Sequence, residues 1–256
     1  MTIRLMILSS VVATVSLFFQ HPVVPAGLAD INAAVADVAR PATDRERDSQ
    51  RKPAETLAFA GVQAGDQVAE LMPGGGYYTR LLSALVGPKG RLIAVVPAPA
   101  PGTAAGDADY AAPLKALAAD PHYANVSVLV QSVRHLSLSV PVDVVWTSLN
   151  YHDVHNVPNI DIAAFNKAIF DSLKPGGLYL VIDHAATPGA PDSATSELHR
   201  IDPERVKREV TRAGFVLDAE SPILLNAEDS RTVPVFDPAI RGRTAQFIFR
   251  FKKPGS

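Results

Sequence analysis

Apolar and polar positions along the chain follow two alternating periods, which predict strands and helices in turn from residue 66 onward. Short apolar runs predict strands at residues 67–71, 91–96, 126–130, 143–147, 178–182, 215–220 and 244–251. Apolar stripes with helical spacing predict helices at residues 77–86, 110–119, 161–173 and 203–213. This alternation predicts a Rossmann-like, doubly wound α/β fold, with a mostly parallel seven-stranded sheet and helices on both faces.

A different pattern occupies the start of the chain and predicts an export signal. Residues 5–19 form an apolar run behind the single early charge of Arg4, and the run is shorter than a comfortable membrane span. Small residues then offer cleavage after Ala26 or Ala29. Residues 1–29 are therefore interpreted as a signal peptide, with a retained N-terminal anchor as the alternative. We expect an exported protein, periplasmic or secreted, that meets a membrane only if this segment stays uncleaved.

Between this segment and the alternating pattern, residues 30–60 predict a helical lead-in to the α/β domain of residues 61–254. Ile31, Val35 and Val38 recur at helical spacing, and Pro41 interrupts them. The charged stretch that follows, residues 45–52, is expected to be solvated.

Composition narrows the classes of function. The chain has 256 residues, of which 47% are hydrophobic, and this is enough for one sizeable core. Its formal net charge of −2 gives no reason to expect a nucleic-acid partner held by bulk electrostatics. The absence of cysteine excludes disulfides, thiolate metal sites and a cysteine nucleophile.

A glycine-rich turn follows the first predicted strand and opens the first predicted helix. It reads Glu70-Leu-Met-Pro-Gly-Gly-Gly76. A turn without side chains lets a ligand approach the backbone, and the helix N-terminus presents free N–H groups. In an open α/β sheet, ligands bind outside the carboxyl ends of the strands. The turn is therefore a candidate ligand site.

These residues carry a family resemblance. Residues 68–79, Val-Ala-Glu-Leu-Met-Pro-Gly-Gly-Gly-Tyr-Tyr-Thr, resemble the first motif of class I SAM-dependent methyltransferases, and Leu-Lys-Pro-Gly-Gly at residues 173–177 resembles their turn before strand five. Together with Asp-His-Ala at 183–185 and Val-Phe-Asp-Pro-Ala-Ile-Arg-Gly at 235–242, they resemble the bacterial exported "predicted methyltransferase" group. The similarity covers roughly residues 51–254.

The resemblance implies S-adenosyl-L-methionine (SAM) as cofactor and a role for each matching residue. Glu70 would orient the methionine end, Gly74 and Gly76 would let the backbone pass close to the cofactor, and Asn150 would line the methyl-transfer face. The full set implied to bind the cofactor is Glu70, Pro73, Gly74, Gly75, Gly76, Tyr78 and Asn150.

The sequence also departs from the family pattern at the cofactor. Met72 replaces the first glycine of the motif, and Val-Val-Pro at 95–97 stands where an acid usually binds the ribose. Gln-Ser-Val at 131–133 stands where an acid often contacts the adenine. Asp107 or Asp109 can substitute for the ribose acid. The missing acid after the second strand also argues against NAD.

A polar cluster is expected at the same edge of the sheet. Residues 150–155, Asn-Tyr-His-Asp-Val-His, follow the fourth predicted strand, and Asp183 and His184 follow the fifth. Glu197 and His199 come shortly afterwards and can close over the crevice. Three interpretations remain open for the cluster.

In the first interpretation, His152 or His184, with Asp183 beside them, acts as general base, because an imidazole titrates near working pH. In the second, His152, His155, His184 and Asp183 gather a metal ion. In the third, the histidines are structural or loop residues. We favour the first for the catalytic set and assign no metal.

The function predicted from the sequence is a SAM-dependent methyltransferase (EC 2.1.1 class) that acts on an oxygen or nitrogen of a small-molecule substrate. The first alternative is a catalytically degenerate binding protein with the methyltransferase fold. The second is a metal-dependent enzyme that uses the histidine cluster. The substrate and the oligomeric state do not follow from the sequence.

Overall fold

The computed structural model describes residues 27–99 and 109–255. The predicted export segment therefore lies almost wholly outside the described residues, as does Asp107. None of the helices in the described ranges combines the length and the apolar character that a membrane crossing requires.

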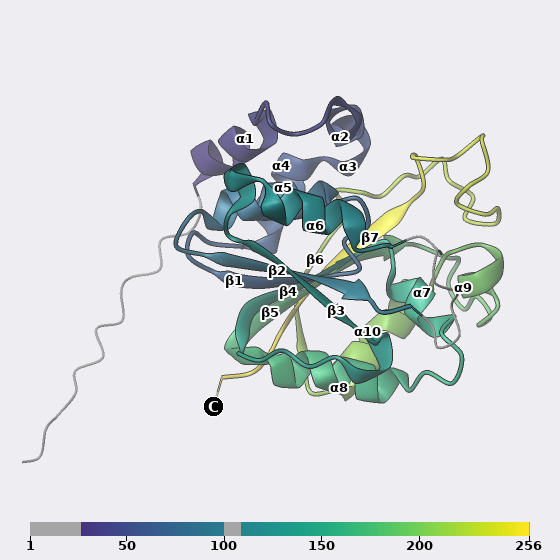
Figure 1. Ribbon diagram of the computed structural model, residues 1–256. Helices are drawn as coiled ribbons and strands as arrows, with labels where there is room; N and C mark the ends of the chain where they lie inside the picture. Colours follow the sequence, from purple (N-terminus) through teal and green to yellow (C-terminus); the bar gives the residue numbers. More distant parts are fainter. Residues whose placement is uncertain (1–26, 100–108, 256) are drawn as a thin grey trace, which may run out of the picture.

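Seven strands form one sheet in the order β3-β2-β1-β4-β5-β7-β6 (Figure 1). Their bounds are β1 Gln67–Leu71, β2 Arg91–Pro97, β3 Val126–Gln131, β4 Val142–Ser148, β5 Leu173–His184, β6 Val216–Ser221 and β7 Gln246–Lys252. The four pairings that join β3, β2, β1, β4 and β5 are parallel, and β7 runs antiparallel to both β5 and β6. This confirms the predicted Rossmann-like, mostly parallel seven-stranded sheet.

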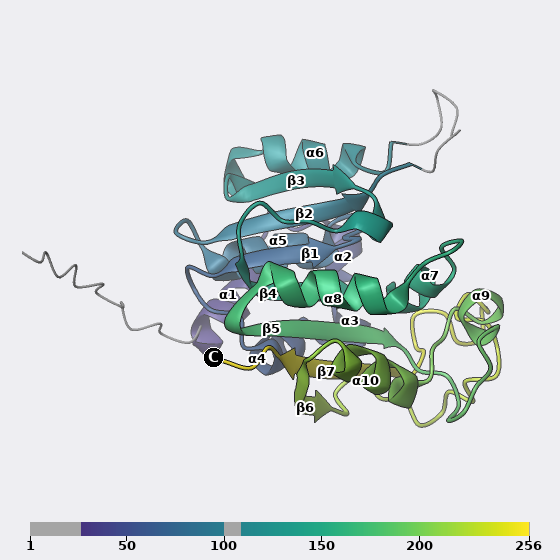
Figure 2. The same cartoon turned by 90° about the horizontal axis from the view of Figure 1, so that it is seen from below.

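Helices cover both faces of the sheet (Figures 1 and 2). One face carries α1 Leu28–Ala36, α4 Pro53–Ala60, α5 Tyr77–Val86 and α6 Ala112–Ala119, and the other carries α7 Tyr151–His155, α8 Ile162–Ser172 and α10 Pro203–Arg212. The shorter elements are α2 Ala42–Arg45, α3 Asp48–Arg51, α9 Ala194–Glu197 and the 3₁₀ turns η1 Pro121–Tyr123 and η2 Val133–His135.

The alternation of side chains along each strand divides the core into two layers. Val68, Val144 and Trp146 face the layer under α5, whereas Ala69 and Val145 face the layer under α8. Because both faces are covered, the central strands are apolar on both sides, as their unbroken apolar runs indicate.

The lead-in differs in detail from its prediction. α1 ends at Ala36, and Val38 is 90% exposed, because the buried face consists of Ile31 and Ala34. Residues 45–52 are not simply solvated. They include α3, whose Asp48 accepts hydrogen bonds from Arg40 and from the Tyr77 hydroxyl. The lead-in helices therefore pack on the first turn of α5.

One strand begins earlier than predicted. β5 starts at Leu173 instead of residue 178, because Val142 already pairs with Leu173 before the register shifts and Val144 pairs with Leu178. Gly177 is required inside this irregular stretch, since a Cβ there would lie 2.9 Å from the carbonyl oxygen of Lys174. The strand thus absorbs the Pro-Gly-Gly turn as a bulge.

Candidate cofactor crevice and histidine cluster

The turn between β1 and α5 combines a packed side with an open side. Gly76 has a φ of 86°, and a Cβ on it would lie 3.1 Å from Leu117 Cδ1 of α6. A Cβ on Gly74 or Gly75 would meet no described atom within 4 Å. Gly76 therefore serves packing and left-handed geometry, whereas Gly74 and Gly75 leave their outer side open to a ligand.

A cavity of about 490 Å³ lies on this open side. Its lining is mostly apolar and comes from three segments at the carboxyl edge of the sheet: Met72, Pro73, Gly74, Gly75, Val96, Pro97, Asp109, Tyr110 and Pro113. This volume falls within the range of small-molecule sites. The structure therefore places Pro73, Gly74 and Gly75 of the predicted cofactor set together on one wall.

Among the described residues, the amides of Gly74 and Gly75 donate to no backbone or side-chain acceptor. The turn is held from its other side, where Arg80 Nη1 donates to the carbonyl oxygens of Gly75 (3.0 Å) and Gly76 (2.9 Å). The same nitrogen lies 3.0 Å from the Asp44 carboxylate of α2. The sequence reasoning missed Arg80, although its position one helical turn after Gly76 was a usable signal.

Met72 separates two spaces at this edge of the sheet. Its φ of 51° lies in the left-handed region, which a residue with a side chain rarely adopts. Besides the larger cavity, Met72 lines a second one of only about 20 Å³, with residues at the ends of β2 and β3 such as Gln131 and Ser132. The side chain thus stands where the motif that the sequence resembles has a glycine.

Glu70 lies beneath the turn and outside the cavity lining. Its carboxyl group is 3% exposed and accepts a 2.6 Å hydrogen bond from the Thr79 hydroxyl in the first turn of α5. Burial raises the pKa of Glu70 to about 8. The effect of burial is larger than the opposing effects of the Thr79 hydrogen bond and of the Arg51 and Arg80 charges, which lower the pKa. At neutral pH the group is therefore largely protonated.

Asn150 and Tyr78 also have structural contacts. Asn150 Nδ2 donates to the carbonyl oxygens of Leu71 (3.3 Å) and Met72 (2.9 Å), while its oxygen accepts from the Thr147 hydroxyl. Asn150 therefore ties the glycine turn to the end of β4. The Tyr78 ring packs in the core against Trp146, at a centroid distance of 4.8 Å, and does not line the cavity.

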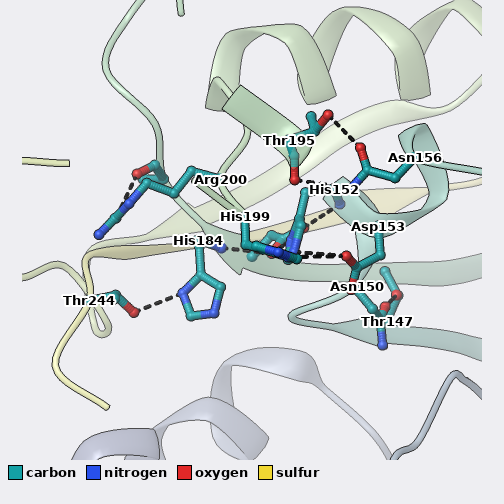
Figure 3. Close-up of polar contacts among 12 residues, drawn as sticks. Thr147, Asn150, His152, Asp153, Asn156, His184, Thr195, His199, Arg200 and Thr244 are labelled. Carbon is teal, nitrogen blue, oxygen red and sulfur yellow. Dashed lines mark hydrogen bonds and ion pairs between the residues drawn. The ribbon is translucent and has the colours of Figure 1, made fainter. Parts of the chain in front are cut away.

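The histidine cluster lies at the carboxyl ends of β4 and β5, at the same edge of the sheet (Figure 3). His152 lies in α7, with Nδ1 2.7 Å from Asp183 Oδ1 and its amide donating to Asp183 Oδ2 at 2.7 Å. Both side chains are buried. His184 follows Asp183 in the sequence, and its Nδ1 lies 2.7 Å from the Thr244 hydroxyl. All three members of the predicted catalytic set therefore lie together, since the His152 and His184 rings are 5.9 Å apart.

The two histidine side chains differ in charge at neutral pH. Burial by itself lowers the pKa of His152. The negative charges and hydrogen bonds of Asp183 and Asp153 outweigh the effect of burial and raise the pKa of His152 to about 10. Burial lowers the pKa of His184 to about 4, more than the Asp183 charge can offset. At neutral pH, His152 is therefore an imidazolium in an ion pair, and His184 is a neutral imidazole.

Two further residues complete the cluster on its solvent side. Asp153 Oδ1 lies 3.3 Å from His152 Nε2 and 3.4 Å from His199 Nδ1. His155 faces away from them and contacts Glu209, with Nε2 3.0 Å from the carboxylate. The structure therefore does not assemble the metal set that the sequence left open, which included His155. Glu197 is exposed and bonds Ser193, so of the two residues expected to close over the crevice only His199 reaches the cluster.

The strand order 3-2-1-4-5-7-6, the glycine turn after β1 and the cavity beside it define a chain with the Rossmann-like methyltransferase fold. No family model matches the chain, and no curated protein matches its sequence. The narrower resemblance to the exported bacterial group thus remains a prediction.

Solved structures match the fold across most of the chain. A SAM-dependent methyltransferase from Aquifex aeolicus superposes with a TM-score of 0.57 at 16% identity, covering 89% of this chain and 98% of that one. Aeropyrum pernix fibrillarin, crystallised with natively bound SAM, gives 0.51 at 18% identity over 80% and 76%. An arsenic(III) SAM methyltransferase from Chlamydomonas reinhardtii gives 0.54 at 20% identity over 88% and 73%. At these identities the likeness shows the fold.

Proposed function

We propose that this protein binds SAM in the cavity beside Gly74 and Gly75 and transfers its methyl group to an oxygen or nitrogen of a small molecule. The observation that carries the proposal is the open glycine turn at the carboxyl end of β1, at the centre of a sheet with methyltransferase strand order. Its structural neighbours include a methyltransferase that requires SAM and a fibrillarin that holds it.

The residues of the cavity suit an amphipathic nucleoside with a charged tail. The amides of Gly74 and Gly75, which have no acceptor among the described residues, can donate to a carboxylate, which the nearby N-terminus of α5 also favours. Val96 and Pro97 offer an apolar wall to the nucleoside, and Asp109 brings the carboxylate that the end of β2 lacks. Asp109 is therefore the residue we assign to the ribose hydroxyls.

When bound, SAM supplies an activated methyl group on a sulfonium, so the protein contributes mainly alignment and exclusion of water. A neutral acceptor oxygen or nitrogen must also lose a proton. Of the predicted catalytic residues, His184 is already neutral at working pH, whereas His152 must first give up its own proton. Because its pKa is about 4, His184 is a weak base, and it can accept the proton only as the acceptor becomes acidic on gaining the methyl group. Asp183 orients both, since it accepts the backbone amide of each.

Titration calorimetry with SAM and with its demethylated product tests the proposal directly. The two ligands should bind the wild type, and Gly75→Leu should weaken both by at least about tenfold, because the new side chain fills the cavity. Gly75→Leu should fold normally, since Gly75 is not in the left-handed region and its outer side is open. No binding by the wild type at millimolar ligand would end the proposal.

A second candidate function is a binding protein that has lost catalysis. It is favoured by Met72, whose side chain occupies the place of the first motif glycine, and by the space of only about 20 Å³ beside Gln131. It predicts that the cavity holds a ligand other than SAM, which mass spectrometry of the purified protein would detect. A methylated product formed from isotope-labelled SAM would instead exclude it.

We also propose that the protein is exported through residues 1–29, as in the exported group that the sequence resembles. The apolar run behind Arg4 and the small residues that end at Ala29 support this. Fractionation of cells that express the full chain, with sequencing of the mature N-terminus, tests it. An N-terminus that still begins at Met1 in a cytoplasmic fraction would contradict it.

A further inference from the structure

The solvent side of the histidine cluster presents three metal-ligating side chains from two segments far apart in the sequence. His152 and Asp153 are neighbours in α7, and His199 lies in the turn between α9 and α10. In Figure 3 the His152 and His199 rings both approach the Asp153 carboxylate. Two imidazoles and one carboxylate are a ligand set that divalent transition metals prefer.

The distances between the ligand atoms fit a single ion. Asp153 Oδ1 is 3.3 Å from His152 Nε2 and 3.4 Å from His199 Nδ1, and all three ligand atoms lie within 4.8 Å of one another. Ligands about 2.0–2.1 Å from a tetrahedral zinc ion are separated from each other by roughly 3.4 Å. Two of the three separations therefore match already, and a small movement of one partly exposed side chain can adjust the third.

The contact between His152 and Asp183 is of the kind that metal-ligating histidines make with a second residue. Its other ring nitrogen, Nδ1, is 2.7 Å from the Asp183 carboxylate, which is fully buried. A histidine that binds a metal usually donates its second N–H to a carboxylate, because this fixes the tautomer and directs the free nitrogen at the ion. Here that arrangement directs His152 Nε2 at Asp153, and an ion bound there would displace the proton that Nε2 carries toward Asp153 in the ion-free protein.

The cluster is also open to an ion from solution. The side chain of Asp153 is 46% exposed and that of His199 is 33% exposed, while His152 is buried behind them. The buried guanidinium of Arg200, the residue after His199, does not compete for these ligands, because it is paired with Asp229 through two hydrogen bonds. His199 itself is braced by Phe236, whose ring lies 4.8 Å from the imidazole.

From this geometry we propose that His152 Nε2, the Asp153 carboxylate and His199 Nδ1 form a site for one divalent transition-metal cation. Three protein ligands leave at least one position of a four-coordinate ion to water or to a ligand oxygen. The proposal is independent of methyl transfer, because it concerns only the binding of the ion. If these side chains bind no ion, they form only a partly exposed group of His–Asp ion pairs, and the experiment distinguishes a metal site from such a group.

The test uses untagged full-length protein that has been treated with a chelator and then titrated with Zn²⁺ by calorimetry, with Co²⁺ as a spectroscopic probe. We expect one Zn²⁺ per chain and the intense visible d–d absorption of tetrahedral Co²⁺. Asp153→Asn and His199→Gln should each weaken Zn²⁺ binding by at least about tenfold and abolish the Co²⁺ bands, because each removes a ligand. Asp183→Asn should weaken binding by about 10–100-fold without removing a ligand.

Matched controls are His135→Gln and Asp171→Asn, which change exposed residues of the same types elsewhere on the surface. Both should bind Zn²⁺ as the wild type does. Circular dichroism establishes that Asp153→Asn and His199→Gln are folded, which their partial exposure favours. Failure of the wild type to take up Zn²⁺ at micromolar concentration, or equal affinity in the ligand variants and the wild type, would overturn the site.

Discussion

Glu70 and Thr79 join the end of β1 to the first turn of α5 through a 2.6 Å hydrogen bond beneath the glycine turn. Both side chains are buried, and the cavity lies on the opposite side of the turn. Glu70 therefore holds the first turn of α5 to the end of β1 instead of lining the cavity. The bond thus joins the two elements that flank Gly74 and Gly75, which line the cavity.

This buried carboxyl predicts a pH dependence of stability. Its pKa is about 8 in the folded protein and near 4.5 when exposed, so the folded state holds a proton that the unfolded state releases between these values. Stability should therefore fall as pH rises from about 4.5 to 8 and level off above. Glu70→Gln should remove this fall and be more stable than the wild type at pH 9 by at least about 1.4 kcal/mol, which corresponds to one pKa unit.

Urea denaturation at pH 5, 7 and 9 measures the effect, and Glu55→Gln is the control, because Glu55 is exposed in α4. The control should follow the wild type at every pH. Parallel curves for Glu70→Gln and the wild type would show that Glu70 is ionised in the folded protein.

Met72→Gly should increase the affinity for SAM by roughly threefold to tenfold. The substitution removes a side chain that lines the cavity and relieves a φ of 51°, so the turn gains both space and freedom. Calorimetry measures the affinity. Lys52→Gly is the matched control, since Lys52 also has a positive φ of 42° but lies away from the cavity. An unchanged affinity in Met72→Gly would show that the Met72 side chain does not hinder the ligand, and a weaker affinity would show that it contributes to the ligand site.

Asp109→Asn should weaken SAM binding by about fivefold to tenfold, because a carboxylate at the cavity is the group available to accept bonds from ribose hydroxyls. The carboxylate also pairs with Lys115 Nζ at 3.0 Å. Lys115→Met separates the two roles, since it breaks the ion pair and leaves the carboxylate in place. Equal losses in the two variants would assign the effect to the ion pair instead of the ligand.

Asp229→Asn should destabilise the fold by about 3–5 kcal/mol, the usual consequence of removing one partner of a buried ion pair. The Arg200 and Asp229 side chains are fully buried, and Asp229 also accepts the amide of Ala245. The pair therefore fastens the long segment before β7 to the segment after β5. Chemical denaturation provides the measurement. Asp171→Asn, in an exposed pair with Lys167, should change stability by less than about 0.5 kcal/mol.

Much of the fold was predictable, because local spacing carries the information. Two elements have the predicted bounds: the strand at Gln67–Leu71 and the helix at Tyr77–Val86. Apolar periodicity marks the body of each element, and the glycines at 74–76 and 87 mark where the helix begins and ends. The start of β5 was not predictable, because Pro-Gly-Gly reads locally as a turn. It becomes part of a strand only through pairing with β4.

The candidate site was predicted less completely. The sequence located the open turn at Gly74 and Gly75 and placed His152, Asp183 and His184 at one edge of the sheet, and the structure brings each group together. It could not distinguish His155 from His199 as the neighbour of Asp153. His155 is only two residues from Asp153 yet contacts Glu209 of α10, whereas His199 reaches Asp153 from a distant turn.

The sequence alone determined the order of strands and helices, the glycine turn and the absence of cysteine chemistry, because these depend on residue type and short-range spacing. Tertiary structure alone decided that Glu70 is buried, that Asn150 is used to hold the turn and that Asp153 lies between two imidazoles. Burial and side-chain partners depend on how elements far apart in the chain pack together. That packing sets the pKa values of His152 and His184, and with them the chemistry open to this edge of the sheet.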